Sequence, residues 1–285
     1  MIKILDNGLK LMPSIDGVDS FLFDSDKCML SLNFIRSNNI KRVMLSPFQG
    51  FTENNLKSIL PLCNFVEELV IASEKISYDG LGEFHKLTFL GALDNKMDII
   101  DLNNFPYLLT LNCSVTERLK GLENATSLKQ ITICDYTSKT KDLSALPYLN
   151  SLEYLNLLKT DILTLRGIEC FRNVKKLKVV SASKLEAIAP LHVLSNSIEE
   201  IQIEKCKKIN DYETLATLKS LRKIILSESG EIKSLAFVTE LNNLEFISFW
   251  GTNVLDGNIK YCEGINYVGF DNKRHYTHKT EQFEK

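Results

Sequence analysis

Apolar and polar positions follow a short pattern that recurs through nearly the whole chain. An apolar residue is followed by two free positions, a second apolar residue, one free position and a third apolar residue. Twelve copies begin 20–26 residues apart, at Val18, Ile40, Val66, Leu87, Leu108, Leu128, Leu152, Val174, Ile198, Leu221, Leu244 and Ile265. A repeat of this length indicates a solenoid, in which one structural unit stacks on the next.

Each copy predicts one strand and one return segment. In the copy that begins at Leu152, Leu155 and Leu157 alternate with polar residues, which is the period-two pattern of a half-buried strand. Beyond Thr160 the apolar residues are more widely spaced, so we expect a helical or irregular return on the opposite side. Each copy buries one face against its neighbours, and the core is then a column shared by all copies.

The ninth position of a copy is often short and polar. The residues concerned are Asn95, Thr116, Thr160, Cys206, Ser229 and Thr252. The chain leaves the strand at this position, and a row of short polar side chains is suited to bind the backbone groups that lose their partners there. The same position holds Phe48, Glu74, Tyr136 and Ala182 in other copies, so we expect an incomplete row.

We predict a single domain over residues 1–285, because the repeats run almost from end to end without a linker. Residues 1–17 form an N-terminal cap, 18–272 the repeats, and 273–285 a C-terminal cap or tail. Within the N-terminal cap, Asn7-Gly8 predicts a hairpin with a type I′ turn. Helices are expected in two early inserts, over residues 28–36 and 54–60.

The copies that begin at Leu152 and Leu244 resemble the bacterial, internalin-like class of leucine-rich repeats and the 22-residue repeats of the protein phosphatase-1 regulator. Ile188-Ala-Pro-Leu191 resembles the convex element of that class. The resemblance covers about residues 18–272 and implies an α/β fold, a right-handed leucine-rich-repeat solenoid (horseshoe) with a parallel concave β-sheet and about 12 repeats. For the family it also implies protein binding through the concave side. The export signal, wall anchor and appended catalytic domains of related proteins are not recognisable here.

Composition and charge narrow the possible partners. The net charge of −2 and pI of about 6.2 argue against a dominant attraction to nucleic acid or an anionic membrane. The N-terminus lacks the features of a signal peptide and the chain has no long apolar run, so we expect a cytoplasmic protein. Seven scattered cysteines indicate free thiols in a reducing compartment.

The second, third, fifth, seventh and eighth positions of each copy point away from the core and form the candidate binding surface. An aromatic patch comprises Phe246, Trp250 and Tyr267, which are suited to anchor a protein partner. The alternative is that these rings pack under the C-terminal tail, whose Tyr276 and Phe283 also need apolar neighbours.

Two further patches are predicted. A basic patch includes Lys176, Lys178 and Lys223, together with Lys159, Lys175, Lys205 and Arg222. Glutamates are interleaved on the same strands, so the alternatives are neutralisation across strands or a site for an acidic protein surface or a phosphate group. The third patch consists of Tyr154 and Leu158, extended by Phe89 and Leu93.

Motifs for catalysis and for cofactors are not recognisable. The sequence has no glycine-rich phosphate loop and no nucleophile elbow, and His275 and His278 lack accompanying ligands for a metal. We therefore expect no cofactor, no metal and no enzymatic activity.

The expected function is a protein-binding scaffold that recognises its partner through the concave face. A narrower form of this hypothesis is an inhibitor or immunity protein. The alternatives are a binding protein for a phosphorylated small molecule, which would use the basic strands, and a cell-surface adhesin without its export signal. Neither nucleic acid nor membrane is expected as a partner, and the oligomeric state is left open.

Overall fold

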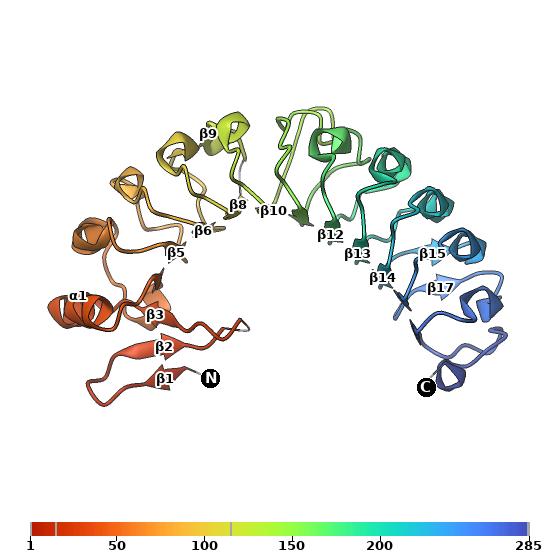
Figure 1. The fold of residues 1–285 in the computed structure, drawn as a ribbon, viewed down its shortest axis with the longest axis horizontal. Helices are drawn as coiled ribbons and strands as arrows, with labels where there is room; N and C mark the ends of the chain where they lie inside the picture. Colours follow the sequence, from red (N-terminus) through yellow and green to blue (C-terminus); the bar gives the residue numbers. More distant parts are fainter. Residues whose placement is uncertain (1, 15, 115, 284–285) are drawn as a thin grey trace. The chain divides into compact units, whose positions relative to one another are not determined.

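The computed structural model describes residues 2–14, 16–114 and 116–283. Two compact units divide the chain, Met1–Ile133 and Cys134–Lys285. In each unit the strands of a main sheet lie along the inner side and short 3-10 helices lie along the outer side (Figure 1). The organisation as a single domain stays a prediction.

The N-terminal unit carries a main sheet in the order β1-β2-β3-β4-β5-β6-β8-β10. Its first two pairings are antiparallel and those from β3 to β8 are parallel. The strands are β1 (Lys3–Ile4), β2 (Lys10–Met12), β3 (Ser20–Leu22), β4 (Arg42–Leu45), β5 (Glu68–Ile71), β6 (Phe89–Ala92), β8 (Thr110–Ser114) and β10 (Gln130–Cys134), with β7 (Ile100–Asp101) and β9 (Leu119–Lys120) in a separate parallel pair. The helices are α1 (Cys28–Ser37), η1 (Ser25–Lys27), η2 (Pro47–Gln49), η3 (Lys57–Leu62), η4 (Leu81–Glu83), η5 (Leu102–Asn104), η6 (Thr116–Arg118) and η7 (Leu122–Asn124).

The C-terminal unit carries a parallel main sheet in the order β11-β12-β13-β14-β16-β18. Its strands are β11 (Tyr154–Leu158), β12 (Lys176–Val180), β13 (Glu200–Glu204), β14 (Lys223–Ser227), β16 (Phe246–Ser248) and β18 (Tyr267–Gly269), with β15 (Glu231–Ile232) and β17 (Asn253–Val254) in a separate pair. The 3-10 helices are η8 (Ile168–Phe171), η9 (Ala189–Leu194), η10 (Tyr212–Thr217), η11 (Ala236–Glu240), η12 (Ile259–Cys262) and η13 (Thr280–Gln282).

The strands lie where the repeat pattern predicts them. Every parallel strand of the main sheets, from β3 to β18, begins at the third position of a predicted copy. The apolar first, fourth and sixth positions form the core, as shown by Leu152, Leu155 and Leu157, whose side chains are fully buried. The fold is thus a leucine-rich-repeat solenoid with a parallel sheet, as predicted, while the number of repeats stays a prediction.

The C-terminal unit bends its backbone in the same way at the end of successive strands. The eighth position of six successive copies has a positive φ, at Asp135, Lys159, Ser181, Lys205, Glu228 and Gly251, with values from 50° to 69°. In the first five, the N–H of this residue donates to the carbonyl at the seventh position of the next copy, as in Lys205 N to Ser227 O at 3.0 Å, whereas Gly251 N donates to the side chain of Asp271. This conformation turns the ninth residue back toward the core.

The predicted row of short polar side chains is hydrogen-bonded between copies at Ser229 and Thr252, whereas the Asn95 side chain bonds within its own copy and Thr160 Oγ1 has no partner among the described residues. Ser229 Oγ accepts from Cys206 N at 3.2 Å and donates to Ile203 O at 3.2 Å. Thr252 Oγ1 repeats the arrangement one copy later, since it accepts from Ser229 N at 2.9 Å and donates to Leu226 O at 2.7 Å. The side chain of Thr116, which belongs to the same row, lies outside the described part of the chain.

At the N-terminal end, the predicted hairpin is present, but its turn differs. Strands β1 and β2 are antiparallel, and Gly8 N donates to Leu5 O at 2.7 Å. Positive φ occurs at Gly8 (74°) and not at Asn7, whose side chain instead accepts from Leu9 N. The connection is therefore a three-residue loop with glycine in the left-handed conformation, where the sequence had predicted a type I′ turn.

Of the two inserts in which helices are expected, the first is confirmed as α1. The second lies further along the chain than predicted and is the 3-10 helix η3, which contains Pro61.

The segment after β18 closes the end of the C-terminal unit. Tyr276 and Phe283 both pack edge-on against Phe270, with ring centroids 5.7 and 6.0 Å away, and Phe270 stacks on Phe249 at 5.0 Å. The hydroxyl of Tyr276 also accepts from Val254 N at 2.9 Å. Residues 273–283 thus act as a cap that covers the last core ring.

Replacing Thr252 by valine is expected to destabilise the C-terminal unit by about 2 kcal/mol. The substitution keeps the side-chain shape but leaves a buried N–H and a buried carbonyl without their partner. Chemical denaturation followed by circular dichroism measures the effect. Thr217→Val, which removes an exposed hydroxyl on η10, serves as the control; equal stability of the two variants would contradict the structural role of the row.

Candidate functional site

The candidate site lies on the open face of the sheet in the C-terminal unit. The third positions of six strands are in register, in the order Tyr154, Lys176, Glu200, Lys223, Phe246 and Tyr267. We call this set the third-position row. Since adjacent strands are about 4.8 Å apart, neighbouring members can touch. The row contains five of the residues that the sequence predicted for partner binding, because the register follows the repeat.

Phe246, Trp250 and Tyr267 form an aromatic cluster at one end of this face. The rings of Phe246 and Tyr267 are stacked, with centroids 4.3 Å apart and planes 9° apart. Trp250 and Tyr267 are 43% and 45% exposed, although both are large rings. Gly269 forms the floor between them, because a Cβ there would lie 2.8 Å from Tyr267 Oη and 3.1 Å from Trp250 Nε1. The sequence analysis did not identify this glycine.

The C-terminal tail does not cover the aromatic cluster with its own rings. Tyr276 and Phe283 contact Phe270, which lies on the buried side of the sheet. Of the two alternatives that the sequence left open, packing under these two tail rings is therefore excluded by their position. The cluster is available to a partner.

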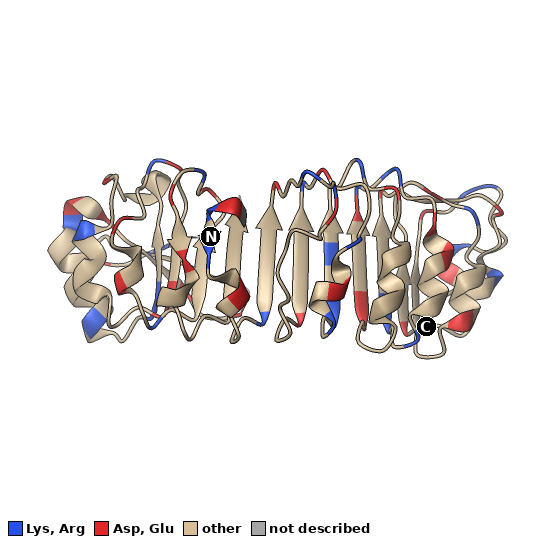
Figure 2. Ribbon diagram, turned by 90° about the horizontal axis from the view of Figure 1, so that it is seen from above, with Lys and Arg blue, Asp and Glu red and all other residues tan. Residues whose placement is uncertain are grey.

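The basic residues are largely neutralised across the strands. Lys176 Nζ lies 2.8 Å from Glu200 Oε1, and Lys178 Nζ lies 3.5 Å from Glu204 Oε1. Flanking pairs repeat the arrangement in Lys175–Glu153, Lys205–Glu228 and Arg222–Glu245. Basic and acidic residues are correspondingly interspersed along the C-terminal unit (Figure 2). Lys223 differs, since its Nζ lies 5.0 Å from the centroid of the Phe246 ring.

A shallow hollow of about 160 Å³ lies in the middle of the third-position row. Its walls include four predicted residues, Tyr154, Lys176, Lys178 and Lys223, and burial raises the pKa of the Tyr154 hydroxyl. Gln202 and Ile225 also line it, although the sequence analysis did not select them. Both occupy the fifth position of their copies, so the repeat pattern contained the signal.

Two predicted residues lie apart from this group. Leu158 is at the end of β11, where it pairs with Val180 and does not line the hollow. Phe89 belongs to the N-terminal unit and lines a separate hollow of about 500 Å³.

The hollow in the N-terminal unit contains a charged centre that the sequence analysis missed. The Arg42 guanidinium donates to both carboxylate oxygens of Asp16, at 2.9 and 2.7 Å, to Val18 O at 2.8 Å, and to Glu68. Hydrogen bonding from Arg42 holds the pKa of Asp16 well below its ordinary value. Arg42 thereby fixes the connection between β2 and β3 against the sheet. Arg42 and Glu68 share the third position of adjacent copies, but Asp16 lies outside the repeat.

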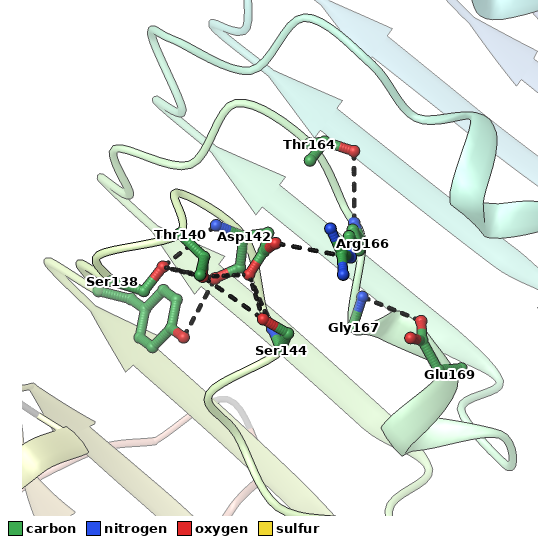
Figure 3. Close-up of polar contacts among 9 residues, drawn as sticks. Ser138, Thr140, Asp142, Ser144, Thr164, Arg166, Gly167 and Glu169 are labelled. Atoms are coloured by element: carbon green, nitrogen blue, oxygen red, sulfur yellow. Dashed lines mark hydrogen bonds and ion pairs between the residues drawn. The ribbon is translucent and has the colours of Figure 1, made fainter.

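Asp142 is a buried carboxylate that is hydrogen-bonded by residues of its own segment (Figure 3). Its Oδ1 accepts from Thr140 Oγ1 at 2.5 Å, from Ser144 Oγ at 2.6 Å and from Ser144 N at 3.0 Å. Burial opposes ionisation, but these hydrogen bonds outweigh it and lower the pKa of Asp142. Asp142 therefore orders the long connection between β10 and β11, and its Oδ2 lies 3.9 Å from Arg166 Nε.

The cysteine and histidine side chains do not assemble a reactive centre among the described residues. Burial raises the pKa of Cys206 to about 11 and that of Cys262 to about 12, so both thiols are protonated at neutral pH. His275 Nε2 faces Val254 O at 2.9 Å, whereas His278 Nε2 faces Glu263 at 3.2 Å. No group of three or more potential metal ligands occurs in the described ranges.

Within the described ranges, the helices are all too short or too polar to cross a membrane.

No protein-family model and no curated protein matches this sequence. Solved structures similar to the chain include an internalin (InlF) from Listeria monocytogenes, at 20% identity over 75% of this chain and 69% of that chain, with a TM-score of 0.49. Others are the TLR13–ssRNA13 complex (18% identity, 75% and 35% covered, TM-score 0.46) and internalin C2 from Listeria monocytogenes (17%, 61% and 77%, 0.37). Internalins, which the sequence resembles, are thus among these structures.

Phe246→Ala is expected to cost about 1 kcal/mol of stability, because the ring is partly exposed and mainly loses its stacking on Tyr267. Phe249→Ala is expected to cost about 3–5 kcal/mol, because this ring is fully buried against Phe270. Urea denaturation of the two variants compares them directly. A similar loss in both would show that the aromatic cluster is part of the core and not a free surface.

Asp16→Asn is expected to flatten the acid-induced loss of stability. The pKa of Asp16 is lower in the folded than in the unfolded chain, so its ionised form stabilises the fold above the unfolded pKa of about 3.9. That contribution is lost as the pH falls below about 4. Melting temperatures between pH 7 and pH 2 measure the effect, with the exposed Asp79→Asn as a control. If Asp16→Asn had the same dependence of melting temperature on pH as the native chain, the stabilising role of the Asp16 carboxylate would be refuted.

Proposed function

We propose that this chain is a non-catalytic scaffold that binds a partner protein through the open sheet face of its C-terminal unit. The observation that carries the proposal is the aromatic cluster. Phe246 and Tyr267 stand on adjacent strands of a hydrogen-bonded sheet, Trp250 lies in the turn that follows β16, and Trp250 and Tyr267 are more than 40% exposed. The tail rings that might have covered them are engaged with Phe270.

The chemistry of the cluster supports a protein partner. Tryptophan and tyrosine are the residues most often responsible for binding energy at protein interfaces, because they bury a large area and lose little conformational entropy. The side chains here stand on strands whose register is fixed by backbone hydrogen bonds. A preordered surface of this kind avoids part of the entropic cost of association.

The alternative of a phosphorylated small molecule receives less support. Ion pairs with Glu200 and Glu204 compete with any phosphate for Lys176 and Lys178. The hollow beside them, at about 160 Å³, is also smaller than the roughly 300–1,000 Å³ of most small-molecule sites. The same neutralisation disfavours nucleic acid, whose binding requires unpaired basic groups along the backbone.

We extend the proposal to the narrower role of inhibitor or immunity protein, which the extent of the surface supports. A stable protein complex buries roughly 1,200–2,000 Å², and a sheet of six parallel strands with its flanking loops offers a broad, continuous surface. The seven cysteines form no disulfide among the described residues, which supports a reducing compartment, so we place the scaffold in the bacterial cytoplasm rather than on a cell surface.

Recovery of a partner from source-cell lysate tests the proposal. The bait proteins are the native chain, a Tyr154→Ala/Phe246→Ala/Trp250→Ala variant, and a matched control, Tyr148→Ala/Leu163→Ala/Val193→Ala, whose exposed apolar residues lie outside the main-sheet strands. All three must first show the same melting temperature. We expect the first variant to reduce recovery of a specific protein at least tenfold, since each interface anchor is worth about 2 kcal/mol.

Two results would contradict the proposal. Equal recovery by both alanine variants would place binding elsewhere on the chain. Absence of any protein recovered specifically by the native bait would count against a scaffold function altogether.

A further inference from the structure

The aromatic cluster is bordered by hydrogen-bond donors that have no partner among the described residues. Lys223 Nζ contacts the Phe246 ring and forms no ion pair with a described residue, unlike Lys176 and Lys178 on β12. Trp250 Nε1 and Tyr267 Oη both lie over Gly269 and make no hydrogen bond within the described part of the chain. Two neutral donors and one ammonium group thus lie around the same rings.

The acidic groups of the same surface are already engaged. Glu200 pairs with Lys176, and Glu204 pairs with Lys178. Asp271 Oδ2 accepts from Gly251 N at 2.6 Å, which holds it at the end of the strand beside Trp250. The cluster therefore presents hydrogen-bond donors to a ligand. The carboxylates at the third and seventh positions of these copies, in contrast, already interact with groups of this chain. The face is complementary to an acceptor and not to a cation.

The number and type of the donors favour a carboxylate over a phosphate. Sites for phosphate usually combine several cationic groups or the bidentate fork of an arginine. Here the nearest arginine, Arg222, is bound bidentately to Glu245, at 2.7 and 3.0 Å from one of its nitrogens. A single ammonium group matches the single charge of an aspartate or glutamate side chain.

The spacing of the strands sets the geometry of the ligand. Lys223 is one strand from Phe246 and two strands from Tyr267 in the third-position row. Two strand spacings amount to about 10 Å, which equals about three residues of extended chain. A peptide that crosses the strands could therefore place a carboxylate on Lys223 and an apolar side chain two or three residues away on the Phe246–Tyr267 stack.

We propose that the aromatic cluster and Lys223 together bind a protein segment in which an aspartate or glutamate lies two or three residues from an aromatic or other large apolar residue. This proposal rests on the proposed function, that the open face of the C-terminal unit binds protein, and it specifies the chemistry of the partner. The carboxylate pairs with Lys223, while the apolar side chain covers the stacked rings and the edge of Trp250.

Selection from a displayed library of random 12-residue peptides on the immobilised full chain tests the proposal. Peptides that bind the native chain but not the Tyr154→Ala/Phe246→Ala/Trp250→Ala variant should be enriched in the acidic–apolar spacing. A synthetic enriched peptide is then compared with its Glu→Gln or Asp→Asn analogue. Trp250 is the only tryptophan of the chain, so its fluorescence reports directly on occupancy of this site.

Variants of the two lysines give the decisive comparison. Lys223→Met retains the aliphatic part of the side chain and should weaken binding of the acidic peptide about tenfold, the change expected when one partner of a partly buried ion pair is removed. The neutral analogue should bind the native chain and Lys223→Met equally. Lys233→Met, which removes an exposed lysine outside the main sheet, should leave both affinities unchanged.

The outcomes separate this inference from the function on which it rests. Enriched peptides that require the aromatic cluster but carry no acidic residue, or that bind Lys223→Met as tightly as the native chain, would overturn only the carboxylate assignment. Peptides that bind the triple-alanine variant equally well, or a failure to enrich any peptide, would overturn both proposals.

Discussion

The architecture depends on how each copy ends its strand. At that point, in the six copies that begin at Leu128 to Leu244, the backbone turns through a left-handed residue, and in several of them the next residue directs a short polar side chain inward. In the copies around Ser229 and Thr252, this side chain binds an N–H and a carbonyl of the preceding copy. The contact satisfies buried backbone groups and sets the vertical alignment of successive strands at the same time. The third-position row exists because that alignment is maintained from strand to strand, so the surface proposed for binding depends on hydrogen bonds made on the other side of the sheet.

Much of this could be predicted from the sequence, because a repeat converts spacing along the chain into position in space. Once Phe246 and Tyr267 are assigned to the same position of adjacent copies, their proximity follows without further information, and the stacked rings confirm it. The same reasoning predicted the polar row and placed Lys176 beside Glu200. This reasoning could not decide whether the lysines form ion pairs with the neighbouring glutamates or remain free to bind a ligand, because that depends on side-chain conformations that a repeat does not specify.

Most of the failures lie where the repeat is interrupted. The turn at Gly8, the capture of Asp16 by Arg42 and the hydrogen bonds around Asp142 involve irregular segments, whose paths depend on contacts distant in the sequence. The tail is a similar case. Tyr276 and Phe283 needed apolar neighbours in either alternative, and only the structure shows that they cover Phe270. Gly269 was missed for a different reason, because its importance lies in the space it leaves for two rings.

The left-handed residues at the strand ends have an energetic meaning of their own. Only one of the six, Gly251, is of the type that adopts this conformation without steric cost; the others include Lys159, Lys205 and Glu228. A left-handed conformation costs a residue with a Cβ roughly 1–2 kcal/mol. The chain thus has long charged side chains along this edge, at positions where glycine would relieve backbone strain. Substitution by glycine at these positions is a route to a larger free energy of unfolding. The edge is consequently a natural starting point for engineering a more heat-resistant scaffold without altering the face that carries the aromatic cluster.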